Sequence, residues 1–351
     1  MIYIFESTRN CRGGAEWSRN SPADVLKYAV GALLYTPATH PAIADDICMQ
    51  KHSALKSIAL CLEDAIRDES TAYAEKCLYA TVQRIYSAVF RGLIEIDSIP
   101  LVFIRVRDPE QMKRVFEELK DFCEIITGFI LPKFDHTNAG RYSEVLCGIN
   151  SQTGNLRIYA MPIIESGSVA NVETRQEALA GIKSSLAGIS NYVLNVRVGG
   201  NDFCNQFGVR RNINNTIYDI GVINNILIDI INVFSRQYIV SAPVWEYFGK
   251  QGAGEWEPGL RKELALDKLN GFVGKTAIHP SQIPVIQEEM AVECADYEDA
   301  KRILNWESDI LGVQRGVLLD RMNELKVHRK WAEKILALAG VYGVKTNEKY
   351  S

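Results

Sequence analysis

The sequence predicts an α/β fold of the (β/α)₈ barrel class, in which eight parallel strands are each followed by a helix. Eight short, nearly continuous apolar runs alternate with longer segments of helical spacing, over roughly the 250 residues that such a barrel needs. Continuous apolar runs are typical of parallel strands that are covered on both faces. A doubly wound open sheet is the structural alternative, but no Gly-x-Gly-x-x-Gly pattern follows the first run.

The predicted strands share short length, apolar or β-branched residues and turn residues at their ends. In chain order they span residues 31–36, 57–62, 100–106, 128–132, 158–164, 192–198, 238–244 and 271–278. The helical pattern is clearest where Val82, Ile85 and Val89 recur on one face of the segment 71–90. Further helices are predicted at 109–120, 139–150, 170–187, 216–234 and 256–269.

Two regions lie outside the eight units. Residues 1–28 are polar and predict an irregular N-terminal arm, whereas residues 29–295 form the predicted catalytic barrel. Residues 296–351 are predicted to be a C-terminal helical extension, which either packs against a neighbouring subunit or caps the barrel.

The composition indicates a soluble globular protein of the cytoplasm. The chain has 351 residues, of which 47% are hydrophobic and 23% charged, with a net charge of −4. The acidic net charge gives no support for nucleic-acid binding, and no apolar run is long enough to predict a membrane span. The N-terminus lacks the basic start and following apolar stretch that are typical of a secretory signal. The eight cysteines form no Cys-x-x-Cys pair, which indicates reduced thiols rather than a zinc cluster or a disulfide framework.

Polar residues stand at the ends of the predicted strands, where the active sites of barrels form. In chain order these strand-end residues are Glu63 with Asp64, Arg105, Lys133, Glu165, Asp202 and His279. One such residue would be unremarkable, but six positions at the same end of the barrel predict a functional site.

Glu165 and Asp202 follow consecutive predicted strands, so their carboxylates are expected to converge on one cation. Two carboxylates with open water positions suit Mg²⁺, and no His/Cys set favours zinc. Gly199 and Gly200 permit backbone conformations that would deliver Asp202 to a fixed place. The alternatives are two unrelated strand-end acids and, for the glycines, an ordinary strand followed by a turn.

Arg105 lies inside an apolar strand, where a buried guanidinium needs an anion such as a substrate carboxylate. A structural ion pair with Glu63 or Asp64 is the alternative and does not exclude that role. Lys133 follows a proline at a strand end, where it is either a charge partner or a lysine that forms a Schiff base with a carbonyl substrate.

Two roles remain open for each of three further residues. His279 precedes a proline that holds its backbone extended, and it is either a satisfied structural histidine or a ligand-binding residue. Arg210 and Arg211 are either a solvated charge pair or a contact for a phosphate or carboxylate.

Taken together, the motifs resemble those of the HpcH/HpaI aldolase and citrate lyase β-subunit superfamily. They occur in the family's order from about Leu33 to Ile283. The matching stretches are CLEDAIRDE (61–69), FIRVRD (103–108), ILPKFD (130–135), PIIES (162–166), GGNDF (199–203) and GKTAIHPSQI (274–283). The last of these is the most specific.

The resemblance implies a TIM barrel that assembles as a trimer or hexamer and breaks or forms a carbon–carbon bond with Mg²⁺. It implies that Glu165 and Asp202 are the metal ligands and that Arg105 holds a 2-oxo acid. Glu63 and Asp64 would support the metal's waters and orient Arg105. Lys133, Gly199, Gly200 and His279 are further candidates for substrate binding.

The sequence departs from the family near the expected acyl or coenzyme A site, so use of a CoA thioester is left open. Glu165 is followed by Ser-Gly-Ser-Val rather than Thr-Ala-Arg-Gly, and Asn201 replaces a glutamate. These features resemble a divergent citrate-lyase-like subfamily associated with bacterial stress or tellurite-resistance gene clusters. The alternatives are a condensing or thioester-hydrolysing enzyme on the same site, and a non-catalytic barrel that acts as a scaffold.

Overall fold

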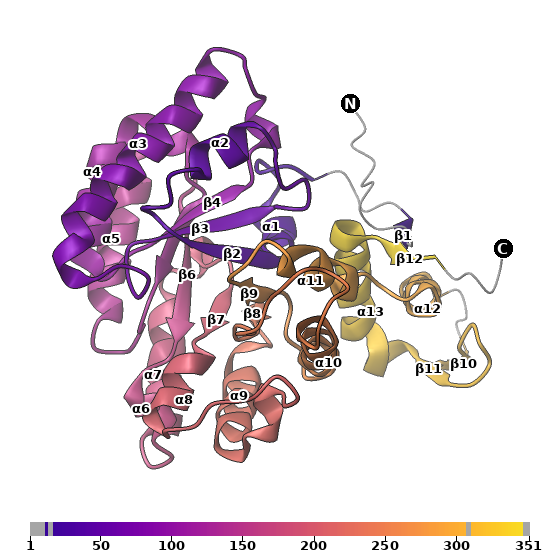
Figure 1. The fold of residues 1–351 in the computed structure, drawn as a ribbon. Coiled ribbons are helices and arrows are strands. Elements are labelled where there is room, and N and C mark those ends of the chain that lie inside the picture. Colours follow the sequence, from indigo (N-terminus) through magenta and orange to yellow (C-terminus); the bar gives the residue numbers. More distant parts are fainter. Residues whose placement is uncertain (1–10, 13–16, 307–309, 347–351) are drawn as a thin grey trace.

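The computed structural model describes residues 11–12, 17–306 and 310–346. Eight parallel strands form one sheet in the order β8-β7-β6-β5-β4-β3-β2-β9, which curls into a barrel (Figure 1). The sheet closes where the Ala242 amide donates a 3.0 Å hydrogen bond to the carbonyl of Gly274. The predicted (β/α)₈ barrel is therefore confirmed. Its strands are β2 (Ala32–Pro37), β3 (Ser57–Cys61), β4 (Leu101–Arg105), β5 (Gly128–Leu131), β6 (Tyr159–Ile164), β7 (Val196–Val198), β8 (Val240–Ser241) and β9 (Lys275–Ala277).

Helices surround the barrel and connect its strands (Figure 1). The α-helices of this layer are α2 (Ile43–Cys48), α3 (Thr71–Phe90), α4 (Pro109–Leu119), α5 (Ala139–Gln152), α6 (Gly167–Ala170), α7 (Arg175–Ala187), α8 (Gly200–Gln206), α9 (Gly221–Phe234), α10 (Trp256–Leu269) and α11 (Gln282–Met290). The short 3₁₀ turns are η1 (Asp68–Ser70), η2 (Ile96–Ser98), η3 (Lys120–Ile125), η4 (Ser190–Tyr192) and η5 (Ile217–Asp219). Helix α4 begins where Pro109 follows Asp108, whose carboxylate accepts a 2.7 Å hydrogen bond from the Gln111 amide.

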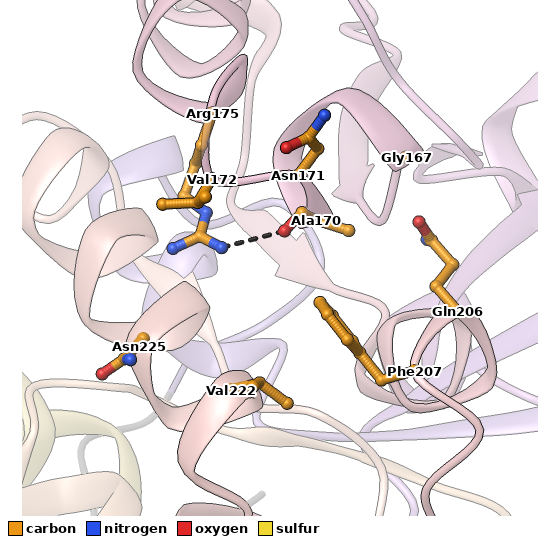
Figure 2. Close-up of a pocket in the computed structure, with 9 residues that line it drawn as sticks. All are labelled: Gly167, Ala170, Asn171, Val172, Arg175, Gln206, Phe207, Val222 and Asn225. Carbon is orange, nitrogen blue, oxygen red and sulfur yellow. Dashed lines mark hydrogen bonds between the residues drawn. The ribbon is translucent and has the colours of Figure 1, made fainter.

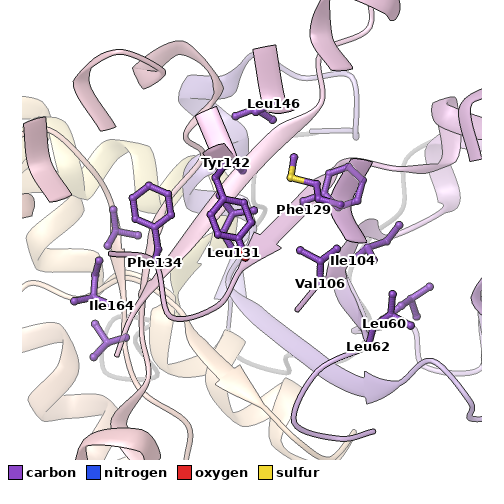
Figure 3. Close-up of a cluster of buried hydrophobic side chains, with 14 of the residues drawn as sticks. Leu60, Leu62, Ile104, Val106, Phe129, Leu131, Phe134, Tyr142, Leu146 and Ile164 are labelled. Atoms are coloured by element: carbon purple, nitrogen blue, oxygen red, sulfur yellow. The ribbon is translucent and has the colours of Figure 1, made fainter. Parts of the chain in front are cut away.

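The alternation of side chains along the strands produces two apolar layers. On β4, Val102 and Ile104 face outward into a cluster shared with the helices, part of which Figure 3 shows. Leu101 and Phe103 face inward and fill the barrel with side chains from other strands. The next inward residue on β4 is Arg105, so a polar layer follows this apolar inner layer at the carboxyl end of the strand.

The amino end of the barrel is closed by residues that the sequence assigned to an irregular arm. Residues 23–29 form helix α1 (Ala23–Ala29), and its Leu26, together with Val30, belongs to the inner apolar cluster. The Arg19 guanidinium donates hydrogen bonds of 2.7 and 2.8 Å to carbonyls of Glu124 and Ile125, which precede β5. Residues 1–10 and 13–16 of the predicted arm lie outside the described residues.

The C-terminal extension also contacts the amino end of the barrel. It comprises α12 (Cys294–Leu304), a hairpin of β10 (Val313–Arg315) and β11 (Met322–Glu324), α13 (Leu325–Tyr342) and β12 (Val344–Lys345), which pairs with β1 (Cys11–Arg12). The Tyr342 hydroxyl donates a 2.5 Å hydrogen bond to the Tyr28 carbonyl just before β2. Lys334 donates a 2.8 Å hydrogen bond to the Gly271 carbonyl just before β9. The extension therefore leaves the carboxyl ends of these strands uncovered.

No helix among the described residues is long and apolar enough to cross a membrane.

Candidate active site

A cavity of about 390 Å³ opens at the carboxyl ends of the strands. Its lining includes Tyr35, Asp64, Arg105, Glu165, Arg197, Gly199, Gly200, Asp202 and Thr276, which come from six different strands or the turns that follow them. The cavity is therefore at the end of the barrel where the sequence predicts a functional site.

Arg105 is the centre of an acidic cluster. Its Nη2 lies 2.7 Å from Glu63 Oε2, 2.9 Å from Asp64 Oδ2 and 3.7 Å from Glu165 Oε1. Burial opposes ionisation of Asp64, but the charge of Arg105, a hydrogen bond with Glu63 and the charge of Lys133 together outweigh it and lower the pKa of that carboxyl. The guanidinium is buried, and its Nε has no hydrogen-bond partner among the described residues. The unpaired N–H group belongs to a residue that lines the cavity.

Lys133 has a backbone conformation that is unusual for a residue with a side chain. Its φ of 48° lies in the left-handed region. In this conformation its amide donates a 2.8 Å hydrogen bond to Glu165 Oε1, and its Nζ donates a 2.5 Å hydrogen bond to Glu63 Oε1. Lys133 therefore connects two predicted site acids, which favours a charge partner over a Schiff-base lysine because its amine is already engaged.

Glu165 and Asp202 come together across the turn after β7. Asp202 lies in the first turn of α8 rather than at the strand end itself, and it forms no hydrogen bond or ion pair with any described residue. Glu165 is buried, and this burial, together with the negative charge of Asp202, raises the pKa of its carboxyl. A cation held by both carboxylates would favour their ionised forms.

The donor set fits a hard divalent cation. No group of three or more His, Cys, Asp or Glu side chains among the described residues is arranged as a metal cluster. Two carboxylates with access to water and substrate oxygens match the coordination that Mg²⁺ prefers. A Cβ added at Gly199 would lie only 2.0 Å from Glu165 Oε2, so the absence of a side chain there provides the space that the carboxylate occupies.

The mutation Gly199→Ala tests this space. The added methyl group would push the Glu165 carboxylate away from its present position, so we expect Mg²⁺ affinity to fall by about 10- to 100-fold, as when a residue that supports a ligand is lost. Calorimetric titration of Mg²⁺ measures the change. A variant that folds and binds Mg²⁺ as tightly as the wild type would contradict the assignment of Glu165.

The turn that follows Glu165 is fixed by serines and an aspartate. Ser166 Oγ lies 2.9 Å from Ser168 Oγ, which donates a 2.6 Å hydrogen bond to Asp135 Oδ2. Asp135 belongs to the loop that also carries Lys133. The Ser-Gly-Ser sequence thus joins two loops of the site by side-chain hydrogen bonds.

We expect Ser168→Ala to lower the free energy of unfolding by about 1–2 kcal/mol at pH 7, because a buried carboxylate loses a hydrogen bond. Burial would raise the pKa of Asp135, but hydrogen bonds from Ser168 and Ser166 lower it below 3.8. The stabilisation is therefore complete above pH 3.8 and disappears as the pH falls through the lowered value. Urea unfolding of both proteins at pH 7 and pH 3 measures it; an equal difference at both would contradict this role of Asp135.

The structure does not bring His279 into the cavity. Its ring stacks on Phe248 with 4.6 Å between the ring centroids, and its Nδ1 lies 2.8 Å from Ser281 Oγ. Its neighbour Ile278, rather than His279 itself, is among the described residues that line the cavity. These contacts favour the structural alternative for His279.

The two arginines of the loop after α8 have different environments. Arg210 is exposed and pairs with Glu246 at 3.0 Å. Arg211 is buried over the Trp245 ring, donates a hydrogen bond to the Val244 carbonyl and lies 3.7 Å from Glu263. Arg211 therefore holds the loop to the barrel and is not part of a solvated pair.

Sequence reasoning missed Tyr35 and Arg197, which both line the cavity. The guanidinium carbons of Arg105 and Arg197 lie 5.7 and 5.9 Å from the centre of the Tyr35 ring. Arg197 lies inside the predicted apolar strand 192–198, just as Arg105 lies inside an apolar strand, so the same pattern could have identified it.

A second hollow of about 470 Å³ lies beside α6, α7, α8 and α9 (Figure 2). Its lining is mainly apolar and includes Val172, Phe207 and Val222. Arg175, at its edge, donates hydrogen bonds to the carbonyls of Val169 and Ala170 and pairs with Asp229 at 3.0 Å. None of the predicted site residues lines this hollow.

Comparisons with known proteins agree with this architecture. A family model described as a C–C bond lyase of the TIM-barrel fold matches residues 24–344. CitE of Mycobacterium tuberculosis, solved with magnesium, acetoacetate and coenzyme A, has a TM-score of 0.58 and 18% identity, covering 90% of this chain and 99% of that chain. The citrate lyase β-subunit of M. tuberculosis, solved with oxaloacetate and magnesium, has a TM-score of 0.51 and 18% identity, covering 75% and 98%. No curated protein matches significantly in sequence.

Proposed function

Because the chain belongs to the C–C bond lyase family of the TIM-barrel fold, we propose that it is a Mg²⁺-dependent carbon–carbon lyase or aldolase acting on a 2-oxo or 2-hydroxy acid. The observation that carries the proposal is the pair Glu165 and Asp202, two carboxylates that line one cavity beside Arg105. Magnesium in the similar M. tuberculosis structures supports the choice of metal.

In the proposed mechanism, Glu165 and Asp202 would hold the metal, which supplies a Lewis acid for the substrate carbonyl when bound. The Lys133 amide and the space at Gly199 fix the Glu165 carboxylate. Arg105, oriented by Glu63 and Asp64, lies beside Glu165, where its charge would stabilise the oxygen on which negative charge develops.

In the lyase direction the substrate hydroxyl loses its proton to a base, and the O–H electron pair forms the carbonyl of the 2-oxo acid. The carbon–carbon bond breaks, and its electron pair leaves with the other fragment as an enolate, which then takes up a proton. Arg105 stabilises the developing negative charge in both cleavage and condensation, because its guanidinium is permanently protonated and already held in place by Glu63.

The proposal also covers the assembly of the protein, its location and the source of the second fragment. We propose a homo-oligomer, a trimer or hexamer, in the cytoplasm. The coenzyme A in the similar M. tuberculosis structure favours a thioester as the source of the second fragment. A scaffold without turnover is disfavoured, because a barrel that binds nothing gains no stability from burying Glu165 beside a second acid, Asp202.

Calorimetric titration of wild-type protein with pyruvate, with Mg²⁺ or with EDTA, tests the proposal. We expect binding only with Mg²⁺, because a 2-oxo acid offers two oxygens to the cation. Isobutyrate, which has similar shape but no oxo group, is the matched control and should not bind. Failure of pyruvate, oxaloacetate and glyoxylate to bind in the presence of Mg²⁺ would contradict the proposal, as would binding that EDTA does not change.

A further inference from the structure

Arg197 is a buried cation that has no counter-charge. It lies on β7 with 1% of its surface exposed, and its Nη2 donates a 2.6 Å hydrogen bond to Thr276 Oγ1. Its Nε and Nη1 are buried and have no hydrogen-bond partner among the described residues. No carboxylate in the described part of the chain pairs with it, whereas Arg105 in the same layer pairs with three.

This arrangement is expensive unless a ligand completes it. The Thr276 hydroxyl and the neighbouring Tyr35 ring replace only part of the hydration that this buried guanidinium loses, and the positive charge of Arg105 adds repulsion. The unpaired Nε and Nη1 belong to a residue that lines the cavity. A planar fork of N–H groups matches the two oxygens of a carboxylate.

Arg175 shows what a structural arginine looks like in this protein. It is also buried, but its Nε and Nη2 donate to backbone carbonyls and its Nη1 pairs with Asp229, so each nitrogen has a partner (Figure 2 shows the bond to Ala170). Arg197 differs because two of its nitrogens lack a partner among the described residues although the residue lines the cavity. Its environment therefore indicates an anion-binding residue.

We propose that Arg197 binds a second carboxylate of the substrate, one that is separate from the 2-oxo acid group held beside Arg105, Glu165 and Asp202. The enzyme would thereby select dicarboxylic acids over acids that end in a methyl group. This inference rests on the proposed function and adds to it the residue that determines specificity. Thr276 keeps the guanidinium in place through its hydroxyl group.

Oxaloacetate and 2-oxobutyrate form a matched pair for the test, since both have four carbons and differ by a carboxylate in place of a methyl group. In the presence of Mg²⁺ we expect wild-type protein to bind oxaloacetate about 10- to 100-fold more tightly, as a charge-assisted contact provides. Arg197→Gln should remove this preference and leave the 2-oxobutyrate affinity unchanged. The stable diacid 2-oxoglutarate checks that decarboxylation of oxaloacetate does not produce the result.

Three results would overturn the inference. Equal wild-type affinity for the two acids, or an equal loss of both in Arg197→Gln, would refute it while leaving the proposed function intact. Absence of binding of either acid to the wild type would refute both. The two failures are therefore distinguishable.

Thermal unfolding of the metal-free proteins is a readout that does not depend on ligand binding. Arg197→Met should raise the melting temperature by about 2–4 °C, because it removes an uncompensated buried charge. The control Arg175→Met should lower it, since it leaves Asp229 and two carbonyls without their partner. A decrease in both variants would show that Arg197 is structural.

Discussion

Asp202→Asn is expected to abolish Mg²⁺-dependent binding of 2-oxo acids, with an affinity loss of more than about 100-fold. Even residues that only support a metal ligand change metal affinity by about 10- to 100-fold, and we propose that Asp202 is itself a ligand. Asparagine has the same shape as aspartate, but its amide oxygen is neutral, so the metal would lose a negatively charged ligand. Calorimetric titration of pyruvate in the presence of Mg²⁺ measures the effect.

The fold should survive this substitution, because Asp202 forms no hydrogen bond or ion pair with any described residue. An unchanged or higher melting temperature would show that lost binding is not lost structure. Asp121→Asn, which removes one exposed acid from η3, is the matched control and should bind pyruvate as the wild type does. Normal binding by Asp202→Asn would refute its role as a ligand.

Lys275→Met is expected to lower the free energy of unfolding by about 3–5 kcal/mol. Lys275 lies on β9 with 0% of its side chain exposed, and its Nζ is 2.8 Å from both Glu263 and Asp267 on α10. Removal of the lysine would leave two acids buried side by side. Burial and the neighbouring Glu263 raise the pKa of Asp267 to about 6 even with Lys275 beside it.

Urea unfolding measures this change, with Lys301→Met as the control. Lys301 pairs with Glu298 on the exposed face of α12, so its loss should change stability by less than about 1 kcal/mol. Adding Glu263→Gln and Asp267→Asn to Lys275→Met should restore part of the loss, since the uncompensated charges are then absent. An effect of Lys275→Met no larger than that of Lys301→Met would contradict the role of this buried network.

The barrel could be predicted from the sequence because its strands are short apolar runs that are covered on both faces. The motif residues could be placed at one end because topology alone brings strand ends together. Glu63, Asp64, Arg105, Lys133 and Glu165 do meet in the structure.

Other features depend on contacts that are distant in sequence. Helix α8 was missed because Gly-Gly-Asn-Asp is typical of a turn, whereas here its first turn packs Gly200 against Ile217 and Pro243. The position of the C-terminal extension depends on hydrogen bonds such as that from Tyr342 to Tyr28, which no local pattern encodes. The orphaned nitrogens of Arg197 could be recognised only after its neighbours were known.

The most direct test of the account is to locate the metal. Crystals grown with Mn²⁺ in place of Mg²⁺ would reveal the cation by its anomalous scattering. The account predicts one strong peak at the cavity, within coordination distance of a carboxylate oxygen of Glu165 and one of Asp202. A well-ordered cavity without a peak between these two residues, or a peak only elsewhere on the protein, would contradict it.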